Sequence, residues 1–132
     1  MTQLDMTNAN PAYLCGRLLA VLEDIQRAAI PGAKATIVDR FFGTASSAPA
    51  SVFGRLMRGA QPHLSKLERD NHGAYMRLQR SLESITRTLT LEEQGLFSLG
   101  YYHQRAHERT EAKAASERKR AGQAEAANDT TL

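Results

Sequence analysis

The feature that most constrains the fold is a helical spacing of apolar residues, which is clearest near the N-terminus. The apolar positions there lie on one helical face, at Leu14, Leu18, Val21, Leu22 and Ile25. Asn10 suits an N-cap, and Pro11 suits the first helical turn. Ile30, Pro31 and Gly32 then end the helix, because proline cannot continue the pattern of backbone hydrogen bonds. The sequence therefore predicts a helix between Asn10 and Ile30.

Residues 33–42 are compatible with two structures. The run ATIV is rich in β-branched residues and fits a short strand. However, Ile37 and Phe41 stand four apart, as residues on one helical face do, and we favour a helix. We expect it to end at Gly43, with TASSA as a tight loop and Pro49 at the start of the next helix.

Two further helical patterns occupy the middle of the chain. The first runs through Phe53, Leu56, Met57, Ala60, Leu64 and Leu67. Pro62 interrupts it and predicts a kink or break near Gly59–Gln61. The run DNHG, at residues 70–73, predicts a turn. The second pattern is a narrow seam at Tyr75, Leu78, Leu82, Ile85 and Leu89, which is typical of a helical bundle.

The last helix has a clear start. Thr90 and Glu93 have the spacing of a capping box. The expected buried face consists of Leu96, Phe97 and Tyr101. Gly95 and Gly100 weaken a helix, and are tolerable where another backbone approaches closely.

The fold class that follows is all-α, a compact bundle of five or six helices in a single domain. We expect a flexible N-terminus at residues 1–9, the helical bundle at 10–107, and a polar tail at 108–132. The tail could extend the last helix for a few turns. It has no apolar face to bury, so we expect its end to be disordered.

The chain carries no run of 18 apolar residues, so no membrane contact is expected. The opening MTQLDMTNAN lacks the basic start and apolar run of a secretory signal. Cys15 is the only cysteine, which excludes an internal disulfide and fits a reducing, cytoplasmic setting.

Positive charge is concentrated in the middle of the chain. The net charge is +3, but residues 34–87 hold nine Lys/Arg against four Asp/Glu, whereas residues 91–132 hold six against seven. Arginine outnumbers lysine, which suits planar contact with phosphate, although a solvated helical surface is the ordinary alternative. The candidate nucleic-acid-binding residues are Arg40, Arg55, Arg58, Lys66 and Arg69.

The sequence gives little support for a catalytic function. His103 and His107 have the spacing of two metal ligands on a helix, but a third ligand is missing. Cys15 has no histidine near it in the sequence and fits a small buried side chain better than a nucleophile. Ser46, Ser47 and Ser51 lie in or next to the small-residue loop, without the strand–turn–helix context in which a serine nucleophile is typically found. We therefore expect no catalytic residue, no metal, no cofactor and no enzyme activity.

Three long stretches resemble a known family. They read NPAYLCGRLLAVLEDIQ, ATIVDRFFGTASSAPASVFGRLMR and LEEQGLFSLGYYHQR, and they span roughly residues 10–105. They resemble the C-terminal part of the large subunit of type I-C CRISPR surveillance complexes (Cascade). That part is also made separately, from an internal start, as the small subunit. Because Met1 stands just upstream of the first stretch, we expect the free small subunit.

The resemblance implies a helical bundle that serves a non-catalytic role. Its implied partners are the backbone subunits, the large subunit, the crRNA-containing complex, a neighbouring copy of itself, and the unwound target DNA of the R-loop. Two points depart from the family: Cys15 replaces a larger aliphatic residue, and the tail after residue 107 has no counterpart. No base-reading residue is carried over, so we expect contact with phosphates. Tyr102, off the apolar face, is the one candidate for base stacking.

Two other functions compete with this interpretation. The run SVFGRLMRGAQPHLSKLER could form a helix-turn-helix, and hence a free-standing DNA-binding regulator. Its second piece offers few base-reading side chains at its start. A protein-interaction adaptor, with merely solvated basic residues, is the third hypothesis. Size in solution distinguishes the small subunit from the DNA-binding regulator. A regulator dimerises alone, whereas a small subunit stays mostly monomeric until it joins the complex.

Overall fold

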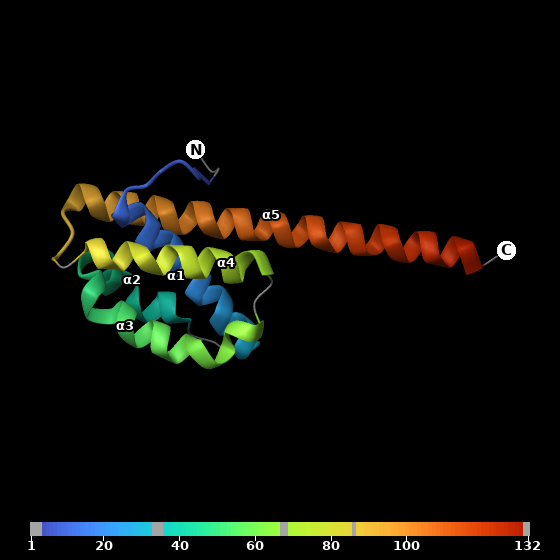
Figure 1. The fold of residues 1–132 in the computed structure, drawn as a ribbon, viewed down its shortest axis with the longest axis horizontal. Coiled ribbons are helices and arrows are strands. Elements are labelled where there is room, and N and C mark those ends of the chain that lie inside the picture. The colour runs from blue at the N-terminus through green and yellow to red at the C-terminus, as the bar shows by residue number, and fades with distance from the viewer. Residues whose placement is uncertain (1–3, 33–35, 67–68, 86, 131–132) are drawn as a thin grey trace.

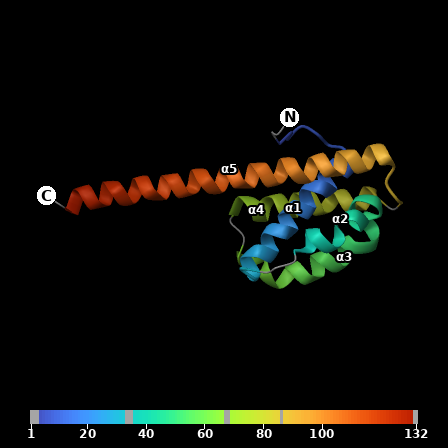
Figure 2. The same cartoon turned by 180° about the vertical axis from the view of Figure 1, so that it is seen from behind.

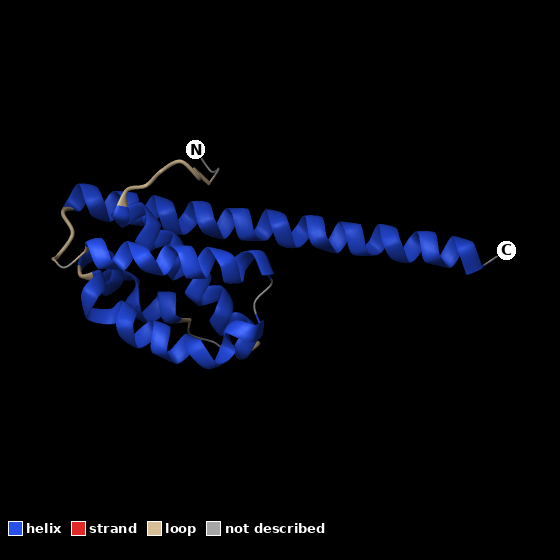
Figure 3. Ribbon diagram, viewed as in Figure 1, coloured by secondary structure: helices blue, strands red, loops and turns tan. Residues whose placement is uncertain are grey.

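The structure, a computed structural model, describes residues 4–32, 36–66, 69–85 and 87–130, without the side chains of 66–71 and 125–130. Throughout these ranges all regular structure is helical, as the sequence predicts (Figures 1 and 3). The α-helices are α1 (Pro11–Ala29), α2 (Ile37–Ser47), α3 (Pro49–Ala60), α4 (Arg69–Leu78) and α5 (Leu91–Thr130). Two 3₁₀ helices, η1 (Gln61–Lys66) and η2 (Gln79–Ser84), complete the fold. None of the helices in the described ranges has the length and hydropathy of a membrane span.

Helix α1 is the centre of the bundle and contacts every other helical element. It is buried on nearly all sides, and its apolar side chains form the middle of the core, from Leu18 and Leu19 to Ile25. The predicted start is confirmed, since the side chain of Asn10 accepts a hydrogen bond from the backbone N–H of Ala12 and Pro11 opens the helix. Helix α5 lies along α1 and then continues past the bundle towards the C-terminus (Figures 1 and 2).

The predicted end of the second helix is wrong. Helix α2 passes through Gly43 and the TASSA run as far as Ser47, and Ala48 alone joins it to α3. The burial of Ala45 explains the extension: it is fully buried, so tertiary packing outweighs the low helix propensity of glycine. At its other end, the helix starts with a capping box of Thr36 and Asp39. The predicted helix in place of a strand, and the start of α3 at Pro49, are confirmed.

The break predicted at Pro62 is confirmed, because α3 ends at Ala60 and the chain tightens into η1. The turn predicted at residues 70–73 is wrong, since these residues lie within α4. The apolar seam predicted from Tyr75 to Leu89 is a continuous α-helix only as far as Leu78. Beyond it the chain forms η2, in which Leu82 is half-buried, while Ile85 and Leu89 remain in the core.

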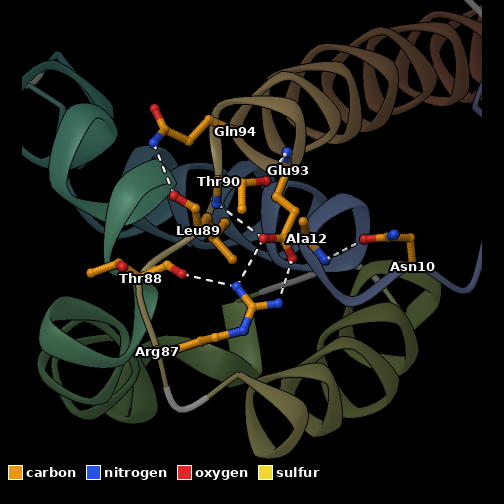
Figure 4. A network of polar contacts seen from close by, with 8 residues as sticks. All are labelled: Asn10, Ala12, Arg87, Thr88, Leu89, Thr90, Glu93 and Gln94. Atoms are coloured by element: carbon orange, nitrogen blue, oxygen red, sulfur yellow. Dashed lines mark hydrogen bonds and ion pairs between the residues drawn. The ribbon is translucent and has the colours of Figure 1, made fainter.

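Helix α5 begins with the predicted capping box. The Thr90 hydroxyl accepts a hydrogen bond from the Glu93 N–H at 3.1 Å, and the Glu93 carboxylate accepts one from the Thr90 N–H at 3.0 Å (Figure 4). The same carboxylate accepts two hydrogen bonds from the Arg87 guanidinium, at 2.8 and 3.0 Å. Phe97 and Tyr101 are buried, as expected. Beyond Glu108 the helix continues with mostly exposed side chains, and the expected boundary of the tail stays a prediction.

Candidate nucleic-acid interface

Three of the five arginine and lysine candidates have described side chains. Arg40 lies in the first turn of α2, and Arg55 and Arg58 lie on α3. All three are exposed. In the part of the chain that the structure describes, they form no hydrogen bond or ion pair. Their charges are therefore available to a ligand outside the protein.

Helices α2 and α3 place these arginines at similar distances from their joint. Arg40 stands eight residues before Ala48, and Arg55 stands seven residues after it. At about 1.5 Å per helical residue, these positions are about 12 Å and about 10 Å along the two helices. The helices pack against each other, so Arg40 and Arg55 lie at about the same level. That they share one surface stays a prediction.

The surroundings of α3 support the extended arginine side chains. Arg55 borders a mainly apolar cavity of about 200 Å³, lined also by Ile25, Leu56 and His63. An arginine stem can cover such a surface while its charged end stays in water. The Arg58 guanidinium lies over Gly54, where it would be 3.6 Å from an added Cβ. An added Cβ at position 54 would thus be in ordinary van der Waals contact with Arg58.

The other two candidates fall at the break between η1 and α4. The backbone of Lys66 ends η1, and that of Arg69 begins α4. The side chains of both lie outside the described residues. Their part in the interface stays a prediction.

The serines at the α2–α3 joint form hydrogen bonds with the backbone. The Ser46 and Ser47 hydroxyls both donate to the carbonyl of Gly43, at 3.0 and 2.9 Å. The Ser47 carbonyl accepts a hydrogen bond from the Leu89 N–H at 2.7 Å, which ties the joint to the segment before α5. This stretch is a structural joint in which the hydroxyls are engaged in local hydrogen bonds.

Tyr102 lies off the core face, as the sequence indicates, with 59% of its surface exposed. Its ring still contacts neighbouring aromatics: the centroid lies 5.0 Å from that of Tyr101 and 6.5 Å from that of Phe42. One face of an aromatic cluster therefore reaches the surface. Base stacking on it stays a prediction.

The residues considered for catalysis take structural positions. His103 is buried, and its Nδ1 lies 3.0 Å from the Tyr13 hydroxyl. Cys15 is fully buried, and its burial raises the pKa of the thiol to about 11. A thiol with such a pKa carries little thiolate at neutral pH. Among the described residues, no three His, Cys, Asp or Glu side chains gather as metal ligands would.

A buried polar network between α1 and α5 was not predicted. Glu23 accepts a hydrogen bond from the Tyr101 hydroxyl at 2.8 Å and pairs with Arg27 at 3.0 Å. Arg105 donates to the same hydroxyl at 3.0 Å. Burial, reinforced by Glu23, raises the pKa of Tyr101 to about 12. The four-residue spacing of Glu23 and Arg27 was visible in the sequence, but their partners on α5 depend on the packing of the two helices.

Residues 1–108 of the chain match the model of a protein family described as CRISPR-associated protein (Cas_Csd1). No curated protein matches the chain. The matched range includes the whole bundle, with Arg40, Arg55 and Arg58, and stops where the side chains of α5 become mostly exposed.

Proposed function

Because the chain belongs to the Cas_Csd1 family of CRISPR-associated proteins, we propose that it is a small subunit of a type I-C surveillance complex. The subunit is non-catalytic. It lines the inner face of the filament of backbone subunits that holds the CRISPR RNA, and it stabilises the unwound target DNA. Its partners are the backbone subunits, the large subunit and a neighbouring copy of itself.

The proposed DNA contact is supported by the arginines on α2 and α3. Arg40, Arg55 and Arg58 are exposed and form no ion pair within the described part of the chain. Guanidinium groups bind phosphates with two parallel hydrogen bonds, and phosphate contacts carry no sequence information. This suits a complex in which base pairing with the guide RNA reads the sequence.

Weak binding by one copy is sufficient for this role. Non-specific binding has a dissociation constant on the order of 10⁻⁴ to 10⁻⁶ M at physiological salt. Assembly holds the subunit beside its strand and raises the effective concentration. The proposal therefore requires incorporation into a complex, and the chain is expected to co-purify with CRISPR RNA and the backbone subunits.

The test rebuilds the complex with a charge-reversed subunit, Arg55→Glu with Arg58→Glu. Both side chains are exposed, so we expect folding and incorporation to stay intact. We expect faster dissociation of target DNA at two salt concentrations, and a similar acceleration on two unrelated targets. The matched control is Arg118→Glu with Arg120→Glu, two exposed residues of α5 outside the family match.

Three outcomes count against the proposal. An unchanged dissociation rate removes Arg55 and Arg58 from the interface. An equal acceleration by the control pair assigns the effect to net charge alone. An acceleration confined to one target indicates base reading, which phosphate contacts cannot provide.

A further inference from the structure

An apolar cavity of about 200 Å³ opens where the end of α1, the start of α2, the end of α3 and η1 meet. Its walls are mainly aliphatic and include Ile25 of α1 and Leu56 of α3. Ile30, directly after α1, also lines the cavity while 56% of its own surface is exposed. The described residues thus leave an apolar surface open to solvent, and pockets that bind small ligands are lined in this way.

Three polar side chains border this cavity and limit what it can hold. Arg55 is exposed, His63 is half-buried, and the described residues that line the cavity include no acidic side chain. The Gln26 carboxamide is oriented by its oxygen, which accepts a hydrogen bond from the Ile37 N–H at 2.7 Å. Its amide nitrogen keeps two donors and forms no hydrogen bond within the described part of the chain. The cavity therefore offers a cation and a hydrogen-bond donor beside apolar walls.

A single base of a nucleic-acid strand fits this combination. Drug-sized ligands occupy pockets of about 300–1,000 Å³, so a cavity of about 200 Å³ suits a smaller ring. Apolar walls can cover the faces of a base, and an amide N–H such as that of Gln26 can donate to the O2 carbonyl that cytosine and thymine share. The Arg55 guanidinium, at the edge of the cavity, can hold the phosphate of the same nucleotide.

We propose that this cavity is a base-binding pocket, which takes one pyrimidine of the bound single strand while Arg55 holds the adjoining phosphate. The proposal rests on the proposed function, because the strand is the one that the α2–α3 arginines bind. Turning a base into a pocket costs least when the base is already unpaired, as it is in unwound DNA. The Gln26 donor suits cytosine and thymine alike, so the pocket adds affinity without reading the target sequence.

The experiment measures binding of the full chain to two fluorescently labelled strands of equal length, oligothymidine and an abasic strand, by anisotropy. The abasic strand keeps the phosphates and lacks the bases, so oligothymidine should bind several-fold more tightly. Gly59 lines the cavity, and a Cβ added to it meets nothing within 4 Å, so Gly59→Leu fills space there without disturbing the fold. This variant should lose most of the preference for oligothymidine and bind the abasic strand as before. Gly95→Leu, at an exposed glycine of α5 with the same free space, is the matched control.

Methyl NMR signals of the cavity follow the pocket in the unsubstituted chain. The signals of Ile25, Ile30 and Ile37, which all line the cavity, should shift with oligothymidine and stay in place with the abasic strand. A shift caused by a peptide of leucine and glutamate, and absent with oligothymidine, assigns the cavity to an acidic protein segment and overturns the proposal. Equal affinity of the unsubstituted chain for the two strands, or equal effects of Gly59→Leu and Gly95→Leu, also overturns it.

The two proposals fail in different ways. If Arg55→Glu with Arg58→Glu speeds the release of DNA from reassembled complexes while Gly59→Leu leaves strand binding unchanged, the pocket is wrong and the proposed function stands. If the chain binds neither strand, the pocket is wrong. If the charge-reversed subunit then also leaves the release of DNA unchanged, the proposed function is wrong as well.

Discussion

Two glycines set the distance between α1 and α5. A Cβ at Gly16 would overlap the carbonyl oxygen of Phe97, and a Cβ at Gly100 would overlap the carbonyl oxygen of Tyr13. The two helices thus approach with backbone against backbone at both positions. This close crossing brings Tyr101 and Glu23 within hydrogen-bond distance.

Replacing Gly100 by alanine should therefore destabilise the protein. The added methyl group would have to push α1 and α5 apart, and overpacking of this kind costs about 1–3 kcal/mol or more. Gly95→Ala is the control on the same helix. A Cβ there meets nothing within 4 Å, so the higher helix propensity of alanine should stabilise by about 0.5–1 kcal/mol. Urea unfolding of both variants tests the pair, and equal effects would contradict the close crossing.

The sequence indicated a close approach at one or both glycines of α5, but could not distinguish them. Gly95 and Gly100 differ only in their position along the crossing with α1. Gly95 is exposed near the start of α5, whereas Gly100 faces Tyr13. That difference depends on the register of two helices far apart in the chain, which local propensity does not encode.

At the level of elements, helix boundaries set by residues within one turn were predicted, whereas boundaries set by packing against other helices were not. Asn10, Pro49 and the pair Thr90–Glu93 act through contacts within one turn, and these can be read from neighbouring residues. The end of α2 depends instead on the burial of Ala45 by other helices. Residues 70–73 read as a turn, yet they belong to α4, where Ala74 and Tyr75 directly after them are buried in the core.

The start of α5 should depend on pH through Glu93. Hydrogen bonds from Arg87 and from the Thr90 backbone lower the pKa of Glu93 from 4.5 to about 2. A group whose pKa is lowered on folding stabilises fully above its unfolded pKa and loses this effect as the pH falls through the folded value. The contribution of Glu93 should therefore disappear between about pH 4.5 and pH 2.

Thermal unfolding of the protein and of Glu93→Gln measures this effect. At pH 6 the variant should melt at a lower temperature, because glutamine has no charge to pair with Arg87. The difference should shrink as the pH falls from 4.5 towards 2. Glu92→Gln, an exposed neighbour in the same turn, controls for the loss of one charge. A difference that is independent of pH would show that the ion pair contributes nothing.

On the scale of the whole molecule, the candidate interface was only partly predictable. The sequence correctly placed Arg40, Arg55 and Arg58 at exposed positions, because each falls between apolar positions of a helical pattern. It did not predict the burial of Arg17, which shares its turn with apolar residues and is buried because α1 is covered on nearly all sides. Burial on all sides is a property of the assembled bundle and leaves no periodic signal in one helix.

The projecting part of α5 gives the last prediction. Residues 111–124 are exposed, apart from the half-exposed Ala114 and Ala115, and both views show this part of the helix beyond the bundle (Figures 1 and 2). A chain that ends after Thr110 should therefore melt within about 2 °C of the full chain, since almost no buried surface is lost. Its circular dichroism should lose the helical signal of the removed residues.

A shorter chain, ending after Gln104, is the control for this truncation. It also loses Arg105, which hydrogen-bonds Tyr101 and approaches the buried carboxylate of Glu23 at 3.9 Å. Removing one member of a buried charge network leaves the others uncompensated, so this chain should be clearly less stable. If the chain ending after Thr110 were destabilised as strongly as this control, the projecting helix would have to pack on the bundle in solution, and the boundary near residue 108 would be wrong.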